Sequence, residues 1–426
     1  MDYVNGLFEF IKKSPTAYHT VDTVKEALIA AGYTECSEKS SESYSDGGRH
    51  FAVRDGSSII AWRGEIKGGF MICATHGDSP SFRVKRSPEL VGDYNRLATE
   101  KYGGMIHYSW LDRPLSVAGR VEVRTERGIE SSLVNIDRDL LTIPSVAIHM
   151  NRTVNDGYKF NPAVDLLPLF GVADTRGCFE TAVAEAAGVG AEDIISHDLF
   201  LYNREEGRVL GADNGLILAP RLDDLACVYS SLVAFLSADS RTAVPVLAVF
   251  DNEEVGSETK QGAASTFLDY TLRRIAASEE RYYAMLSDSF MVSADNAHAK
   301  HPNHPELADS SGAPLLGGGV VIKYNANQRY ATDAVSDAIF RTLAQRAGAP
   351  VQSYNNRADM PGGSTLGSIA DTRVSVATVD IGLPQLAMHS ASECIASRDI
   401  ESLVRALTEL YSSGIVADGE KIDIVK

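Results

Sequence analysis

The chain has 426 residues, of which 44% are hydrophobic and 23% charged, an ordinary composition for a soluble globular protein of two or three domains. Its formal net charge of -17 argues against binding to nucleic acid, because that function needs clustered Lys and Arg. No apolar run approaches the roughly 18 residues of a membrane span, and the first residues show neither a basic leader nor a cleavage signal, so we expect no membrane association and a cytoplasmic location.

The first 85 residues have an α/β pattern. Residues 7–11 and 21–29 repeat apolar side chains at helical spacing and predict two amphipathic helices. Residues 57–62 and 69–75 then predict two strands, the second of which ends at His76.

The pattern changes after Lys85. From about residue 88 to residue 211 the chain shows short alternating patches and several Gly and Pro turns, with one short helical stretch near residues 181–187. We therefore expect an inserted, mainly β domain at residues 86–211, within a discontinuous domain formed by residues 1–85 and 212–426.

From Leu216 onward strands and helices alternate again, which is typical of βαβ units around a parallel sheet. The expected fold class is α/β, a mainly parallel sheet sandwiched by helices. Strands are expected at residues 216–219, 244–250, 290–294, 320–324, 351–354 and 374–379, and helices at residues 222–235, 263–277, 333–347 and 398–411.

The stretch from Val246 to Ser257 contains candidate catalytic residues. An apolar, β-branched run stops at Asp251, Glu253 and Glu254, as expected for a buried strand that opens into a turn. Two adjacent glutamates on a turn point in different directions, so one could hold a metal while the other moves a proton. Alone, the pattern more often belongs to acidic residues that open a helix.

Four further segments place metal-capable side chains after predicted strands or at helix starts. Imidazole and carboxylate together suit a borderline cation such as zinc, and a carboxylate shared by two ions would build a two-metal hydrolase centre. Asp78 would orient an imidazole through its second nitrogen. Individually, the aspartates could be caps or turn residues and the histidines structural, but together they favour a metal site. The residues are His76, Asp78, Asp223, Asp224, Asp295, His298 and His389.

At this point the sequence resembles the aspartyl aminopeptidases, a branch of the dinuclear zinc exopeptidases, over nearly its whole length. Three positions depart from the pattern of that family: Gly77 replaces its usual Thr, Asp224 its usual Asn, and Gly363 its usual Cys. The motifs that carry the resemblance include His76-Gly-Asp-Ser-Pro, Ile148-His-Met-Asn-Arg, Arg221-Leu-Asp-Asp-Leu, Asp251-Asn-Glu-Glu-Val-Gly-Ser, Ser293-Ala-Asp-Asn-Ala-His and Gln385-Leu-Ala-Met-His-Ser.

The resemblance implies a role for each residue. His76 and Asp295 would bind one divalent metal and Glu254 and His389 a second, with Asp223 bridging, Glu253 as general base and Asp78 in support. Zinc is the expected metal, although the same ligands accept cobalt or manganese. Lys323 would receive an acidic substrate side chain, and His149, in the inserted domain, would reach the active site of a neighbouring subunit.

Two structural features are also implied by the resemblance. The peptide bond between Asp223 and Asp224 should be cis, and the chain should assemble through its inserted domain into a homo-oligomer, a tetrahedral dodecamer.

The expected function is that of a zinc metallo-aminopeptidase, an aspartyl aminopeptidase that removes N-terminal Asp or Glu from peptides. Two alternatives remain: a broader two-metal aminopeptidase or deacylase, and a non-catalytic, shell-forming scaffold. Glu253 argues against the scaffold, because a scaffold has no use for a base beside metal ligands.

Overall fold

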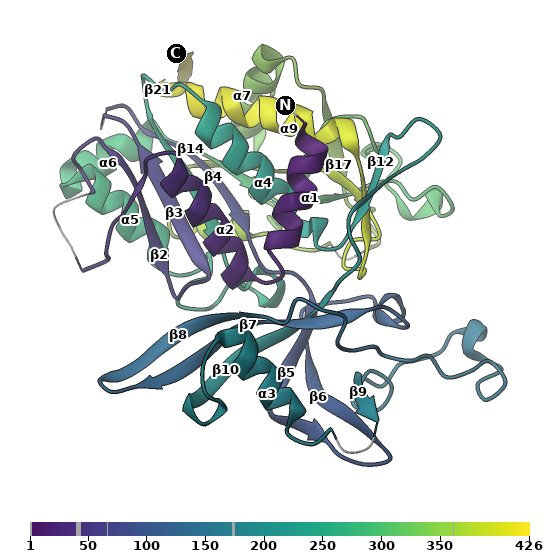
Figure 1. The fold of residues 1–426 in the computed structure, drawn as a ribbon. Helices are drawn as coiled ribbons and strands as arrows, with labels where there is room; N and C mark the ends of the chain where they lie inside the picture. The colour runs from purple at the N-terminus through teal and green to yellow at the C-terminus, as the bar shows by residue number, and fades with distance from the viewer. Residues whose placement is uncertain (1, 40–43, 66, 173–174, 361) are drawn as a thin grey trace.

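The computed structural model describes residues 2–39, 44–65, 67–172, 175–360 and 362–426, in two units around separate sheets (Figure 1). The larger unit is built on a nine-stranded sheet of order β1-β2-β3-β13-β4-β14-β18-β16-β17, whose four central strands, β13, β4, β14 and β18, are parallel. The strands are β1 (Thr34–Glu35), β2 (Arg49–Arg54), β3 (Ser58–Arg63), β13 (Val244–Phe250), β4 (Phe70–His76), β14 (Phe290–Ala294), β18 (Ala377–Gly382), β16 (Val320–Tyr324) and β17 (Val351–Asn355).

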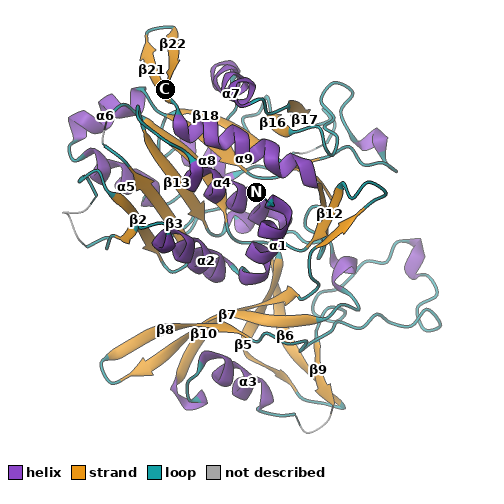
Figure 2. Cartoon of the chain, turned by 45° about the horizontal axis from the view of Figure 1, so that its top comes forward, coloured by secondary structure: helices purple, strands orange, loops and turns teal. Residues whose placement is uncertain are grey.

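Helices cover both faces of this sheet (Figure 2), which explains the unbroken apolar run of β13. Leu247 and Val249 pack with the helices of one face, whereas Val246, Ala248 and Phe250 pack with those of the other. The first face carries α1 (Tyr3–Lys13), α2 (Ala17–Ala30), α4 (Leu222–Ser237), α7 (Ala334–Ala347) and α9 (Ser397–Ser412), and the second α5 (Phe267–Ala276), α6 (Glu279–Ser287) and α8 (Leu366–Asp371).

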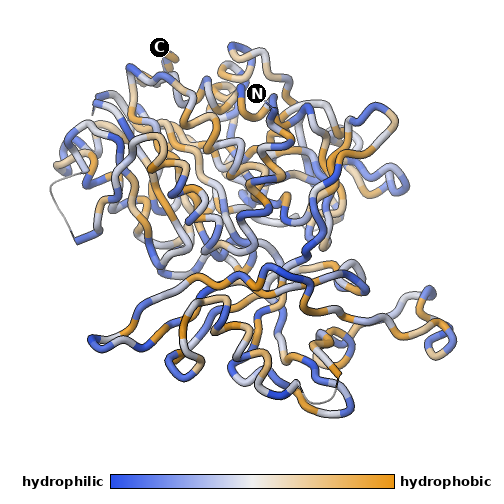
Figure 3. Tube along the Cα trace, viewed as in Figure 1, coloured by the Kyte–Doolittle hydropathy of each residue, from blue (hydrophilic) through white to orange (hydrophobic). Residues whose placement is uncertain are grey.

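The predicted α/β class is therefore confirmed: a mainly parallel sheet lies between two layers of helices. Along the chain trace, hydrophobic residues gather in the central strands, and hydrophilic residues prevail in the outer loops (Figure 3). No helix in the described part of the chain is long and apolar enough to cross a membrane.

The second unit is an antiparallel six-stranded sheet of order β8-β7-β10-β5-β6-β9. Helix α3 (Cys178–Ala187) packs on it through Phe179 and Val183, which share a core with Val121 and Leu199. The strands of this sheet span residues 81–203, and we propose that the unit is the inserted domain expected at residues 86–211. The strands are β5 (Ser81–Leu90), β6 (Tyr94–Tyr102), β7 (Leu115–Thr125), β8 (Gly128–Asn135), β9 (Leu169–Val172) and β10 (Ile194–Asn203).

A five-stranded sheet of order β11-β12-β20-β19-β15 and a terminal hairpin complete the architecture. The loop between β19 and β20 carries His389, so the small sheet places that side chain beside the large one. The strands are β11 (Arg208–Leu210), β12 (Leu216–Ala219), β20 (Glu393–Ala396), β19 (Pro384–Leu386) and β15 (Ala297–His298), with the hairpin formed by β21 (Gly414–Asp418) and β22 (Lys421–Val425).

Two predicted boundaries were wrong. Helix α5 begins at Phe267 rather than residue 263, because Ser265 accepts the Phe267 N–H through its hydroxyl (3.2 Å) after a turn. The strand expected at residues 374–379 is β18, three residues later, because the Val374 N–H still bonds to the Ala370 carbonyl at the end of α8 (2.9 Å).

Candidate active site

Three parallel strands end side by side at one edge of the large sheet. In their register Phe250 of β13 lies opposite His76 of β4, and β14 continues the row on the other side of β4. Glu253 and Glu254 follow β13, and Asp295 follows β14. Because parallel neighbours present their carboxyl ends at the same edge, residues far apart in the sequence meet there.

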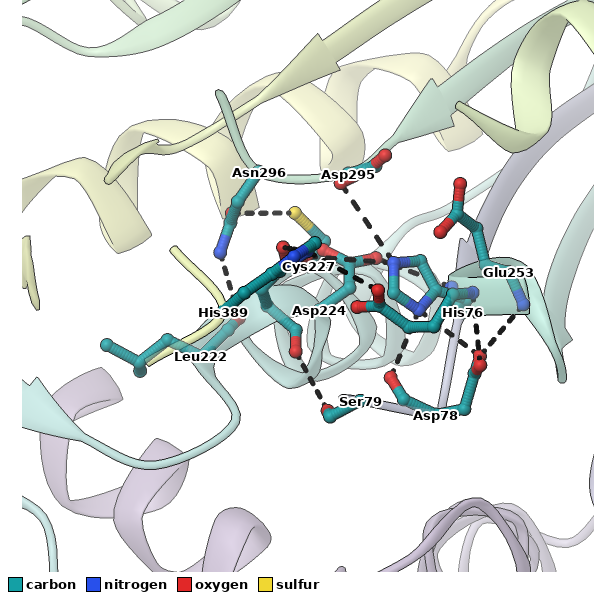
Figure 4. Close-up of polar contacts among 12 residues, drawn as sticks. His76, Asp78, Ser79, Leu222, Asp224, Cys227, Glu253, Asp295, Asn296 and His389 are labelled. Carbon is teal, nitrogen blue, oxygen red and sulfur yellow. Dashed lines mark hydrogen bonds and ion pairs between the residues drawn. The ribbon is translucent and has the colours of Figure 1, made fainter. Parts of the chain in front are cut away.

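Asp223 lies between the two imidazoles of this edge, whose rings are shown in Figure 4. Its Oδ1 is 3.6 Å from Nε2 of His76, and its Oδ2 is 3.5 Å from Nε2 of His389. Each imidazole also faces a second carboxylate: Asp295 Oδ1 is 4.0 Å from His76 Nε2, and Glu254 Oε2 is 3.4 Å from His389 Nε2. The five residues thus form two imidazole–carboxylate pairs that share one aspartate.

The carboxylates of this cluster are buried and incompletely hydrogen-bonded. The side chains of Asp223 and Glu254 are each 3% exposed, and within the described residues Asp223 Oδ1 and Glu254 Oε1 have no hydrogen-bond partner. One ligand atom from each of His76, Asp223 and Glu254 lies within 4.8 Å of the others. Because buried acceptors are costly without a partner and this donor set suits zinc, the residues fit a divalent metal.

Electrostatics support the same interpretation. Burial raises the pKa of Glu253 to about 8, an effect that His76 opposes and the carboxylate of Asp295 reinforces. Burial likewise raises the pKa of Glu254 well above its usual range. For His389 burial lowers the pKa, but the neighbouring carboxylates, Asp223 first, outweigh it and raise the pKa to about 10. The cluster concentrates negative charge that bound cations would stabilise.

Asp78 organises the turn that carries the two glutamates. Its carboxylate accepts the backbone N–H of Glu253 (3.2 Å) and of Glu254 (3.2 Å), and also the hydroxyl proton of Tyr102 (2.6 Å). Its carbonyl oxygen lies 3.1 Å from Nδ1 of His76, which can donate to it and leave Nε2 free as a ligand. Asp78 thus supports both a candidate ligand and the candidate base.

The peptide bond between Asp223 and Asp224 is cis, as predicted. Asp224 belongs to a second close group, with ligand atoms of Asp223, Asp224 and Asp295 within 4.8 Å of one another. Its Oδ2 accepts the backbone N–H of His76 at 3.4 Å, and burial raises its pKa well above the usual range. The sequence placed Asp224 among the metal-capable residues and marked it as a departure from the family pattern, but it assigned Asp224 no ligand role.

Glu393 is a further buried residue that the sequence analysis missed. Its Oε2 accepts the backbone N–H of Asp223 (2.9 Å), and its Oε1 accepts that of His389 (2.7 Å). Glu393 therefore ties the candidate bridging ligand to the loop of the second imidazole. The only sequence signal is a glutamate four residues after His389, which an ordinary strand start would also show.

Lys323 lies directly behind Asp295 and is only 2% exposed. Its ammonium donates to the carbonyl oxygens of Asp295 (2.7 Å) and Asn296 (3.3 Å) and lies 3.6 Å from Asp295 Oδ2. Burial lowers the pKa of Lys323, but Asp295 and other neighbours outweigh it, and the net shift is upward. The predicted substrate-binding lysine thus also contacts the segment that carries a candidate metal ligand.

His149 is not part of this cluster within one chain. It is exposed, in a turn of the long loop between β8 and β9. Its neighbours Ile148 and Met150 are 47% and 82% exposed, which is unusual for large apolar side chains.

The Gly77 departure has a local explanation. A Cβ at Gly77 would lie 3.1 Å from Cγ2 of Thr20 and 3.4 Å from Cγ1 of Val249. We expect Gly77→Thr to lower the free energy of unfolding by about 1–3 kcal/mol through overpacking. Thr20→Ser, which removes the methyl group but keeps the hydroxyl that bonds the Gly77 carbonyl, should recover most of that loss. Denaturant unfolding of both single variants and the double variant measures the coupling, and strictly additive losses would contradict it.

A largely buried cluster of two imidazoles and several carboxylates beyond the strand ends of an α/β sheet has the composition of a metal-dependent hydrolase site. Residues 10–411 match the family described as Aminopeptidase I zinc metalloprotease (M18). The chain is 42% identical over 430 residues to a "Probable M18 family aminopeptidase 2" of Clostridium acetobutylicum, covering 97% of this chain and 99% of the relative. The chain belongs to the M18 family of zinc metallo-aminopeptidases.

Solved structures agree with this assignment. The chain matches one from the "Cryo-EM structure of the Ape4 and Nbr1 complex" with a TM-score of 0.93 and 34% identity, covering 96% of this chain and 85% of that one. It also matches a chain of the S. cerevisiae mApe1 dodecamer with a TM-score of 0.84 and 26% identity, covering 96% of each chain.

Proposed function

We propose that this M18 protein is an aspartyl aminopeptidase, which releases N-terminal Asp or Glu from peptides at a two-metal centre. The observation that supports the centre best is the placement of Asp223, whose two oxygens face two separate imidazoles at 3.6 and 3.5 Å. In this proposal His76 and Asp295 would hold one metal, His389 and Glu254 would hold the other, and Asp223 would be shared by both. Zinc is the proposed ion, since the donors are imidazole and carboxylate.

The bound cations would polarise the scissile carbonyl and acidify the attacking water. Glu253 acts as general base: it takes a proton from the water and returns it to the departing amine. Figure 4 shows its side chain beside His76, on the side of Asp295. The raised pKa of Glu253 reflects burial among carboxylates, and Asp78 holds the backbone of the same turn.

The acidic preference is supported by cations near the site. A cavity of about 270 Å³ is lined by Lys300 and Arg357 and by no Asp or Glu in the described part of the chain. His298 and Tyr354 also line it, and their rings contact each other at 5.9 Å. Because three of the five proposed metal ligands are carboxylates, an acidic substrate side chain needs cations opposite it. We propose Lys323 as the main receiver, with this cavity adding positive potential.

A broader two-metal aminopeptidase or deacylase is the competing function, since the metal cluster alone would serve either. Matched substrates with free and acetylated N-terminal Asp distinguish the reactions. We expect rapid hydrolysis only of the peptide with a free N-terminal amine. Chromatography measures released Asp from that peptide and released acetate from the acetylated one. Faster hydrolysis of the acetylated substrate would favour a deacylase.

We also propose a homo-oligomer, a tetrahedral dodecamer, in which His149 completes a neighbour's site. The exposed apolar residues Ile148 and Met150 beside His149 suit a subunit contact. Dissociated subunits should lose activity before they lose metal, as followed by sedimentation, activity and metal analysis on the same fractions. A fully active monomer would exclude this role. The cytoplasmic location expected from the sequence stays a prediction.

A further inference from the structure

One segment of the inserted domain enters the candidate metal site. It leaves strand β6 at Tyr102 and runs to Ile106, and it contacts both halves of the site. We define residues 102–106 as the crossing segment.

The first contact is made by the hydroxyl of Tyr102. It donates to Oδ2 of Asp78 (2.6 Å) and accepts a hydrogen bond from Nδ2 of Asn252 (2.9 Å). Asp78 in turn accepts the N–H groups of Glu253 and Glu254. Asn252 precedes those glutamates with a positive φ of 63°. One hydroxyl from the inserted domain therefore contacts both Asp78 and Asn252, the two residues that hold the Glu253–Glu254 turn.

The second contact fixes an imidazole. Nδ1 of His389 lies 2.6 Å from the carbonyl oxygen of Gly104, which can only accept, so Nδ1 carries the proton. In the neutral ring, the form that binds a metal, Nε2, the nitrogen that faces Asp223 and Glu254, then presents its lone pair. The N–H of Ile106 also donates to the His389 carbonyl (3.0 Å), which secures the backbone of the same residue.

The crossing segment passes so close to Glu254 that it requires a glycine at position 103. Gly103 has a φ of 74°, and a Cβ built there would lie 3.2 Å from Cβ of Glu254. At Gly104 the nearest atom to such a Cβ is Nδ1 of His389, at an ordinary 3.9 Å. Only the first position excludes a side chain.

We propose that the crossing segment makes the inserted domain a direct determinant of the metal site in its own chain, with Tyr102 as a positioning residue. The proposal rests on the metal roles given under the proposed function. It assigns the inserted domain a task besides subunit contact: to set the tautomer of His389 and the position of the Glu253–Glu254 turn.

The test is Tyr102→Phe in the full-length protein, which removes one hydroxyl. Zinc affinity, measured by competition with a chelator, should fall about 10- to 100-fold, the usual effect of losing a group that supports metal ligands. The visible absorption spectrum of the cobalt-substituted protein should also change, because ligand geometry changes. Tyr202→Phe is the matched control: this buried tyrosine of β10 donates its hydroxyl to Oδ1 of Asn135 (2.8 Å), and its loss should leave affinity and spectrum at parent values.

A second pair of variants, at Gly103 and Gly104, tests the close approach of the crossing segment to Glu254 without removing a hydrogen-bonding group. Gly103→Ala should weaken zinc binding, whereas Gly104→Ala should not. The proposal would be overturned if Tyr102→Phe kept the zinc affinity and spectrum of the parent protein, or if the two tyrosine variants lost affinity equally. It would also be overturned if the loss appeared only together with subunit dissociation in sedimentation. A parent protein that binds no zinc would instead refute the proposed function.

Discussion

Glu253→Gln should reduce turnover of an Asp-peptide by at least about 10²-fold while the zinc content stays at the parent value. Glutamine keeps the size of the side chain but cannot take a proton from water. The backbone N–H of residue 253 still bonds to Asp78, so the turn should keep its shape. Steady-state kinetics and metal analysis on the same preparation measure both quantities.

Two variants of the same region serve as controls. Glu254→Gln should lose metal, because its carboxylate faces His389 at 3.4 Å. Glu258→Gln, at an exposed glutamate of the following loop, should retain both metal and activity. If Glu253→Gln lost as much metal as Glu254→Gln, the roles proposed for the adjacent glutamates would be reversed.

Lys323→Met should lower the preference for Asp-peptides over Leu-peptides by about 10²-fold or more. Methionine preserves length and removes the charge, so a substrate carboxylate loses its partner, whereas the slow rate on Leu-peptides should hold or rise. The kcat/KM ratio for matched Asp and Leu peptides is the measurement. Lys421→Met, on the terminal hairpin, is the control for removing a lysine charge.

The buried position of Lys323 makes metal analysis of this variant essential. The ammonium bonds to the carbonyl of Asp295, so its removal could displace that carboxylate. An unchanged preference with full metal content would show that another residue, such as His149 or Arg357, reads the side chain. Metal loss with unchanged preference would assign Lys323 to the support of Asp295 alone.

The strand that ends at Phe250 was predictable because the apolar side chains that form it are consecutive in the sequence. A strand covered on both faces needs apolar residues at consecutive positions, and the run from Val244 to Phe250 supplies them. The polar residues that follow mark the edge of the sheet. His76 and Asp295 were located in the same way, because each lies at or just after the end of an apolar strand. The sequence therefore predicted the residues that lie at the ends of the central strands.

Asp78 was predicted as a supporting residue, but Glu393 and Gly104 were not predictable, because their contacts are with backbone or side-chain groups far away in the sequence. Glu393 accepts N–H groups from residues 223 and 389, and Gly104 contributes only a carbonyl oxygen to His389. No spacing in the sequence reports such bonds. The terminal hairpin and the shortest strands escaped prediction for a similar reason, since their pairing depends on tertiary context more than on an apolar period.

The most direct test of the central claim compares the release of Asp, Glu and Leu from matched dipeptides by the metal-free and the zinc-reconstituted protein. We predict that activity depends on added metal and that Asp or Glu is released much faster than Leu. Equal rates for Asp and Leu would contradict the acidic specificity, and full activity in the metal-free protein would contradict the metal mechanism.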